Sequence, residues 1–204
     1  MPNRSIYQLN HLPPAERSGI YRALIPPPVF TLFGIDRNTH LNRQGESVVQ
    51  LHTPDSHGFV SVEVKQSAGD LDPIFFLQLS DTPFMDNLEL SFVIINDIRK
   101  ERFNIDRDES GRDTLFGTTL RNPAEEERAM RAGLAPGQVR PGLRLIGEMM
   151  RLLERFASRL KTSIISCEAL FYHNAIQYER LGFGYMEGKK LMEEIDRDFA
   201  PGGG

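Results

Sequence analysis

The stretch Gln138-Val-Arg-Pro-Gly-Leu-Arg144 leads directly into the most regular helical pattern of the 204-residue chain. After it, apolar residues recur at spacings of three and four, which predicts an amphipathic helix with one buried face. These residues are Leu145, Ile146, Met149, Leu152, Leu153, Phe156 and Leu160. Because Gly142 permits a close backbone approach and the first amides of a helix lack internal partners, the stretch predicts an anion site. Arg140 and Arg144 would supply positive charge, and a plain turn into the helix is the open alternative.

A second ordered series of elements follows this helix. The β-branched run 162–167 predicts a strand, and a helix is expected from about 171 to 181, ending at Gly182. A short strand is expected at 183–186 and a helical tail at 189–199. The chain therefore reads, from residue 138 onward, as anion loop, helix, strand, helix and strand.

The second of these helices carries Asn174-Ala-Ile-Gln-Tyr178-Glu-Arg-Leu-Gly182-Phe183. Together with the preceding loop, it resembles the GCN5-related N-acetyltransferases, in which an Arg/Gln-x-x-Gly-x-Gly/Ala loop binds the pyrophosphate of coenzyme A. The residues that carry the helical part of the resemblance are Asn174, Ala175, Tyr178, Gly182 and Phe183. The resemblance extends over about 137–186.

This resemblance implies a transferase that moves an acyl group from acetyl-CoA, or another acyl-CoA, to an amine of a small molecule or peptide. It also implies that two neighbouring strands splay apart, that pantetheine lies in the gap, and that Tyr178 protonates the departing thiolate. A phenol with an ordinary pKa near 10 is chemically able to do so. The expected cofactor-binding residues are Gln138, Val139, Arg140, Gly142, Leu143, Arg144 and Asn174.

The fold class expected is α+β, with a mixed, mostly antiparallel central sheet flanked by helices in a single acyl-CoA N-acyltransferase-like domain. Alternating Val60, Val62 and Val64 support half-buried strands. The expected parts are an opening strand at 5–12 with helices to 46, antiparallel strands at 47–109 ending with one at 102–106, an insertion at 110–136 before the phosphate loop, the CoA-binding half at 137–186, and a tail at 187–204. Within the insertion, Asn122 is expected to cap a helix.

Three departures from the family's arrangement support an alternative function. Arg144 stands where a second glycine is expected, the insertion interrupts the path into the phosphate loop, and a helical tail replaces the last strand. The alternative is a non-catalytic ligand-binding or regulatory protein on a degenerate acetyltransferase fold. The missing strand also raises the expectation that another copy completes the sheet, as in a homodimer.

Carboxylates near the ends of predicted strands are the candidates for a general base. Glu168 and Asp106 are both placed to accept a proton from an amine. Cys167 is expected to be inert packing, and His173 is expected to cap its helix. The stretch Asp106-Arg-Asp-Glu-Ser-Gly111 begins like a calcium loop, but position twelve is Gly117, so a polar turn with Asx-type hydrogen bonds is the preferred interpretation.

The composition restricts the classes of partner. A formal net charge of −4 and a pI near 5.8 give no large positive field, so we expect no nucleic-acid partner. With no apolar run of membrane-spanning or signal-peptide length, we expect no membrane partner and a cytoplasmic location. The single cysteine excludes an internal disulfide and a thiolate cluster, and the histidine spacings predict no metal site.

Overall fold

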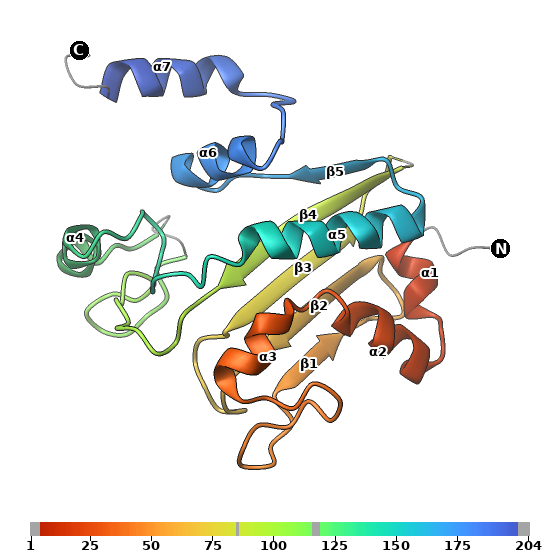
Figure 1. Cartoon of the computed structure of the whole chain (residues 1–204). Coiled ribbons are helices and arrows are strands. Elements are labelled where there is room, and N and C mark those ends of the chain that lie inside the picture. The colour runs from red at the N-terminus through yellow and green to blue at the C-terminus, as the bar shows by residue number, and fades with distance from the viewer. Residues whose placement is uncertain (1–4, 85, 116–118, 200–204) are drawn as a thin grey trace.

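The computed structural model describes residues 5–84, 86–115 and 119–199. The chain forms an α+β structure in which helices flank a five-stranded sheet (Figure 1). In chain order the elements are α1 (Ile6–Asn10), α2 (Pro14–Arg22), α3 (Pro27–Phe33), β1 (Val49–His52), β2 (Phe59–Val64), β3 (Phe75–Asp81), β4 (Asn87–Ile95), α4 (Pro123–Arg131), α5 (Ile146–Leu160), β5 (Ile164–Cys167), α6 (Tyr172–Arg180) and α7 (Lys189–Phe199). The expected α+β class with a mixed sheet is confirmed.

The sheet has the simple spatial order β1-β2-β3-β4-β5. The first three pairings are antiparallel, and β5 joins β4 in parallel. This parallel pair requires a crossover, which α5 provides after the long segment that includes α4. The prediction of a mostly antiparallel sheet from 47 onward is therefore correct for β1 to β4.

Helices α1, α2, α3 and α5 lie across one face of the sheet (Figure 1). They contribute with β1–β4 to a single core cluster, in which Val62, Leu77, Met149 and Leu153 are fully buried. The apolar spacing of α5 explains this placement, because residues three and four apart share the face that meets the strands. The helix predicted after residue 144 is thus confirmed as the main cover of the sheet.

A register change divides β4 into two halves. Gln78 of β3 pairs with Phe92, whereas Leu79 pairs with Leu90, so that Ser91 is left without a partner on β3. This extra residue is a β-bulge, which bends the strand and increases its twist. The pairing of β5 with β4 ends at Leu90, opposite Cys167. Beyond Leu90 no described strand pairs with β4 on that side, and the loop at Gly142 and Leu143 meets it only at Ile95 and Asn96. The two strands lie together at one end and separate toward α6 (Figure 1).

The strand expected at 5–12 is wrong, because this segment forms helix α1. The Ser5 hydroxyl accepts a hydrogen bond from the Gln8 amide at 3.1 Å, as an N-cap does. Asp81 completes the cap, since its two carboxylate oxygens accept the amides of Ile6 and Tyr7, both at 2.8 Å. The cap that decides the conformation is therefore supplied by β3.

Two other expected strands are also absent from the described residues. The segment 102–106 is irregular, and 183–186 is a turn that follows α6. In the segment 102–106, the Arg102 side chain forms ion pairs with Asp72 and Asp106, and the backbone does not pair as a strand. In the second, the Phe183 amide bonds the Tyr178 carbonyl at 3.0 Å, which closes the helix end and turns the chain away from the sheet.

The insertion packs with the irregular segment before it, 102–106, around a small core separate from the main one. Phe103, Ala129 and Leu134 are buried together, and the Arg128 guanidinium lies 4.4 Å from the centre of the Phe103 ring. As predicted, Asn122 caps helix α4, with its side chain accepting from the Glu125 amide at 3.3 Å. The insertion is thus an ordered unit with its own contacts. These contacts do not by themselves fix its position beside the sheet.

The carboxylate of Asp72, which precedes β3, holds the insertion beside the sheet. It accepts hydrogen bonds from Arg102, at 2.9 and 3.2 Å, and from Arg140 Nε at 2.9 Å. Burial opposes the charged form, but the two guanidinium groups outweigh it and lower the pKa of Asp72. One half-buried carboxylate therefore ties the segment before the insertion and the loop before α5 to the sheet.

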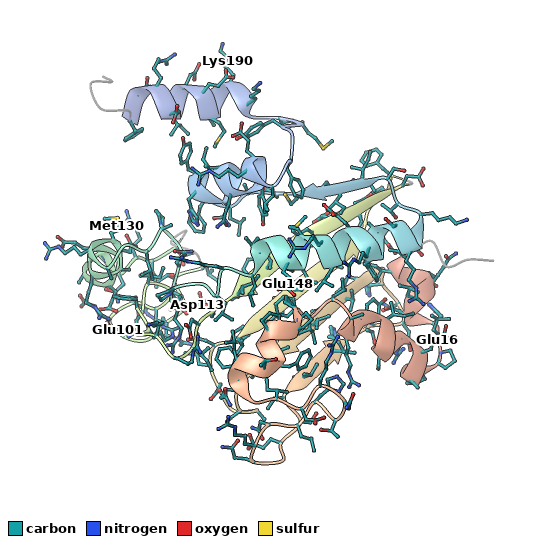
Figure 2. The ribbon with its side chains drawn as sticks, in the orientation of Figure 1. Glu16, Glu101, Asp113, Met130, Glu148 and Lys190 are labelled. Carbon is teal, nitrogen blue, oxygen red and sulfur yellow. The ribbon has the colours of Figure 1, made fainter. Side chains whose placement is uncertain are left out.

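Helix α7 lies beyond α6, at the far side of the molecule from the sheet's first strands (Figure 1). The Tyr172 hydroxyl of α6 bonds Asp196 of α7 at 3.2 Å, and Lys190 points away from α6 (Figure 2). No residue of α7 is buried. The helical tail expected at 189–199 is confirmed, and the last part of the predicted tail, 200–204, lies outside the described residues.

We expect Asp72→Asn to lower the free energy of unfolding at pH 7 by about 2–3 kcal/mol, because two half-buried guanidinium groups lose a charged acceptor. Since the folded pKa lies below the ordinary value of 3.8, this contribution is present above pH ~4 and is lost as the pH falls through the folded pKa. Urea unfolding of both proteins at pH 7 and at pH 3 measures the difference.

Glu127→Gln is the matched control, because Glu127 forms an exposed ion pair with Arg131 and surface pairs contribute at most about 1 kcal/mol. If Asp72→Asn lowers the free energy of unfolding by the same amount at pH 3 as at pH 7, this account of the ion pairs is contradicted.

Candidate functional site

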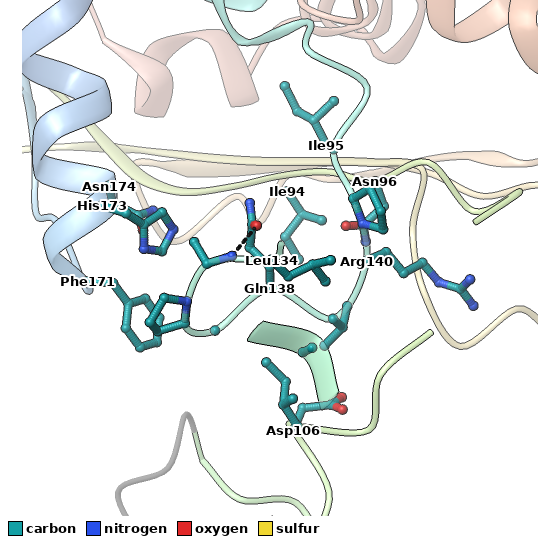
Figure 3. A pocket seen from close by; sticks show the side chains of 18 of the residues that line it. Ile94, Ile95, Asn96, Asp106, Leu134, Gln138, Arg140, Phe171, His173 and Asn174 are labelled. Carbon is teal, nitrogen blue, oxygen red and sulfur yellow. Dashed lines mark hydrogen bonds between the residues drawn. The ribbon is translucent and has the colours of Figure 1, made fainter. Parts of the chain in front are cut away.

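A cavity of about 1060 Å³ opens where β4 and β5 separate. The second half of β4, the insertion, the loop before α5 and the first turns of α6 line it. Figure 3 shows Phe171, His173 and Asn174 on one side of this cavity and Asn96 and Arg140 on the other. The cavity thus exists because the bulge in β4 ends the pairing with β5.

The loop 138–144 is pinned along the end of β4. Pro141 O accepts the amide of Asp97 at 2.8 Å, and Val139 O accepts the amide of Phe103 at 2.9 Å. A side chain at Gly142 would place its Cβ 3.1 Å from the carbonyl oxygen of Ile95, which is tighter than normal contact. Glycine at 142 therefore permits the loop to lie against β4, beside the cavity.

The backbone turns sharply where this loop enters α5. Arg144 has a φ of 60°, and Leu145 follows with φ −97° and ψ 6°. Successive left-handed and right-handed residues direct neighbouring amides to one side, which makes an anion-binding concavity. Neither amide donates a hydrogen bond to a described residue. Arg144 thus adopts the conformation that glycine normally supplies in such loops.

Two helices begin at this cavity without a side-chain cap. Leu145 and Phe171 occupy the N-cap positions of α5 and α6, and neither can accept a hydrogen bond through its side chain. Ser5 and Asn122 cap α1 and α4, whereas α2 and α3, which start with proline away from the cavity, also have no side-chain cap. Uncapped helix N-termini leave amides and the positive end of the helix dipole for an anion. The arrangement is chemically suited to phosphate groups.

The expected cofactor-binding residues have several environments. Gln138, Val139, Arg140, Gly142, Arg144 and Asn174 line the cavity, whereas Leu143 packs against the main core. The Gln138 side chain accepts the Ala135 amide at 3.0 Å, which closes the loop (Figure 3). The Arg140 guanidinium bonds Asp72 and the carbonyls of Ile98 and Lys100. Its charge is therefore paired, while the Arg144 side chain is exposed.

Three buried polar atoms without a hydrogen-bond partner belong to residues that line this cavity: Asp106 Oδ1, His173 Nδ1 and Asn174 Oδ1. The other oxygen of Asp106 accepts from Arg102 at 2.7 Å. Burial lowers the pKa of His173, so its ring is neutral at pH 7. The ring stacks on that of Phe171, with the two ring centres 5.8 Å apart. A buried polar atom without a partner costs about 1–3 kcal/mol, and a polar ligand would remove this cost.

Tyr178 reaches the same cavity from the second turn of α6. Its ring packs 5.4 Å from that of Phe183. Burial first, and then the nearby Cys167, raise the pKa of Tyr178 to about 12. Burial also raises the pKa of Cys167 to about 11, so both groups are protonated at neutral pH. This agrees with the expectation that Cys167 is unreactive.

The two candidate bases lie apart. Asp106 belongs to the insertion wall of the cavity. Glu168 is exposed after β5 and is not among the described residues that line the cavity. Phe171 was not among the residues expected in the site. Its ring packs tightly against Gly137, where the loop meets α6, because a Cβ at residue 137 would overlap the ring. No sequence spacing links residues 137 and 171.

The polar stretch from Asp106 contains the expected Asx-type turn. One oxygen of Asp108 accepts the amides of Ser110 and Arg112, at 2.9 and 2.8 Å, and the Ser110 hydroxyl at 2.7 Å. Gly117 lies outside the described residues. Within the described part of the chain, no cluster of three or more His, Cys, Asp or Glu side chains is placed to hold a metal, and no helix is long and apolar enough to span a membrane.

We expect Arg144→Gly to be about 1 kcal/mol more stable than Arg144→Ala, because both lack the arginine side chain and only alanine retains the cost of a positive φ. The control is Arg151 in the interior of α5, where the order is reversed and alanine is more stable than glycine by about 1 kcal/mol. Urea unfolding of the four variants measures both differences. Equal stabilities of the two Arg144 variants would show that residue 144 does not hold a left-handed conformation.

In comparisons with known proteins, no family model, no curated protein and no solved structure matches this chain.

Proposed function

We propose that the protein is an acyltransferase that moves an acyl group from acyl-CoA to an amine, on an acyl-CoA N-acyltransferase-like fold. The observation that carries this proposal is the separation of β4 from β5 after the bulge at Ser91, with one cavity that reaches both the loop 138–144 and Tyr178. A coenzyme A molecule needs such a path, because its diphosphate and its thioester sulfur lie at opposite ends of the pantetheine arm.

The diphosphate would lie at the start of α5. The amides of Arg144 and Leu145 point to one side, the first turn of α5 has no side-chain cap, and the exposed Arg144 guanidinium adds positive charge. The pantetheine arm carries two amides, and the unpartnered Asn174 Oδ1 and His173 Nδ1 are suited to hydrogen-bond them. These contacts would position the thioester between the separated strands.

In the proposed reaction, the amine nitrogen attacks the thioester carbonyl carbon and forms the new C–N bond. The C–S bond breaks, and the thiolate takes a proton from the Tyr178 hydroxyl. The attacking nitrogen loses a proton to Asp106 or to water, and Tyr178 regains one from solvent. With a pKa raised to about 12, Tyr178 is protonated throughout the neutral range. The same shift makes it a weaker acid than an ordinary tyrosine, so it would donate its proton as the negative charge develops on the sulfur and not before.

Calorimetric titration with coenzyme A, followed by an assay of thiol release from acetyl-CoA with simple primary amines and short peptides, tests the proposal. We expect coenzyme A to bind with micromolar affinity and Tyr178→Phe to keep that affinity within about twofold. The variant should reduce thiol release by about 10²–10⁴-fold, because only the proton donor is lost.

Tyr185→Phe is the matched control, since Tyr185 follows α6 and bonds Glu179 away from the cavity lining. It should leave both affinity and rate unchanged. Coenzyme A binding without thiol release from any acceptor would favour the alternative, a non-catalytic ligand-binding or regulatory protein on the same fold. The absence of binding by coenzyme A and acetyl-CoA alike would refute both the cofactor and the reaction.

A further inference from the structure

We infer that the cavity is built for an acyl group longer than acetyl, whose hydrocarbon chain packs against the wall that the insertion contributes. The inference rests on the proposed function and adds the class of acyl donor. It comes from apolar residues of the cavity lining that have no role in the diphosphate contacts or in the proton transfers proposed above.

That wall is apolar and comes from distant parts of the chain. Ile94 of β4, Ile105, Ala129, Met130 and Leu134 all line the cavity. Figure 3 shows Ile94 and Leu134 close together near its centre, between His173 on one side and Arg140 on the other. Apolar surface that borders an open cavity gains free energy when a hydrocarbon replaces water, which makes this wall suited to an aliphatic chain.

The two arginines near the wall, Arg121 and Arg140, are paired with carboxylates within the protein. Asp72 pairs with Arg140, and Arg121 pairs with Glu126, although all four line the cavity. Their charges are therefore neutralised by neighbours within the protein. A charged acyl group, such as one ending in a carboxylate, would find no unpaired cation on this wall, whereas an uncharged alkyl chain needs none.

The wall is also rigid enough to serve as a binding surface. Ala129 and Leu134 belong to the buried cluster of the insertion, with exposed fractions of 3% and 8%. Asp72 fixes this unit to the sheet through Arg102. Because the wall is already ordered, an acyl chain that packs on it does not have to order it first.

The cavity has room for such a chain. Tyr178 and the insertion wall line one continuous cavity, whose volume of about 1060 Å³ is at the upper end of the range for small-molecule sites. An acetyl group at the thioester adds only two carbons to the pantetheine arm. Each further buried methylene strengthens binding by about fourfold, so an octanoyl chain would bind far more tightly than acetyl if it follows the wall.

Calorimetric titration of the full chain with coenzyme A, acetyl-CoA and octanoyl-CoA tests the inference without an acceptor. We expect octanoyl-CoA to bind at least about 50-fold more tightly than acetyl-CoA, which requires only part of its chain to be buried. Met130→Glu introduces a charge on the wall and should reduce this preference at least about tenfold. Met130→Glu should change the affinity for coenzyme A itself by no more than about twofold.

Met130, on α4 (Figure 2), is a safe site for this change, because it lines the cavity and 58% of its surface is exposed, so a charged side chain there stays in contact with water. Met186→Glu is the control, with 84% exposure and no place in the cavity lining. Leu134→Gln tests the buried part of the wall, after its far-UV circular dichroism and melting transition have shown that it folds.

Each outcome separates the two proposals. Binding of all three ligands with equal affinity overturns the inference about chain length and leaves the acyltransferase proposal intact. A loss of coenzyme A affinity in Met130→Glu, equal to the loss for octanoyl-CoA, also overturns it, because the wall would then contact pantetheine. Failure of every ligand to bind refutes the proposed function itself.

Discussion

The cavity depends on one extra residue in β4. Because Ser91 has no register partner on β3, the side chains that face the core change from Leu88 and Leu90, which are buried, to Val93 and Ile95, which are half-buried. The hydroxyls of Ser80 and Ser91 lie 2.9 Å apart across the two strands. The added twist carries the rest of β4 away from β5. Without the bulge, continued pairing would close the gap, and the loop, α6 and the insertion would have no shared cavity to line.

A second constraint places the surroundings of that cavity. Asp72 joins the sheet, the segment before the insertion and the loop before α5 through Arg102 and Arg140, so three segments that are distant in sequence share one half-buried carboxylate. This explains why the charge of Arg140, which borders the candidate anion site, is paired within the protein. The positive character at the start of α5 comes instead from backbone amides and from Arg144, whose left-handed conformation substitutes for a glycine.

Local signals in the sequence were enough to predict several elements. The apolar spacing after residue 144 predicted α5, and Asn122 before Pro123 predicted the start of α4, because both signals act within a few residues. Helix α1 was missed because Asp81, 74–75 residues away, supplies part of its cap. The bulge was missed because apolar residues continue on both faces of β4 after Ser91, so alternation does not reveal where the register changes. The insertion wall depends on tertiary contacts that no spacing encodes.

The central claim is that the gap between β4 and β5 receives the pantetheine arm of coenzyme A while the start of α5 receives its diphosphate. A crystal structure of the complex with coenzyme A tests this most directly. The account predicts diphosphate oxygens within hydrogen-bond distance of the amides of residues 144–147, and a pantetheine arm that runs along β4 beyond Ser91 toward Tyr178. Coenzyme A bound elsewhere, with the cavity empty of ligand, would contradict it.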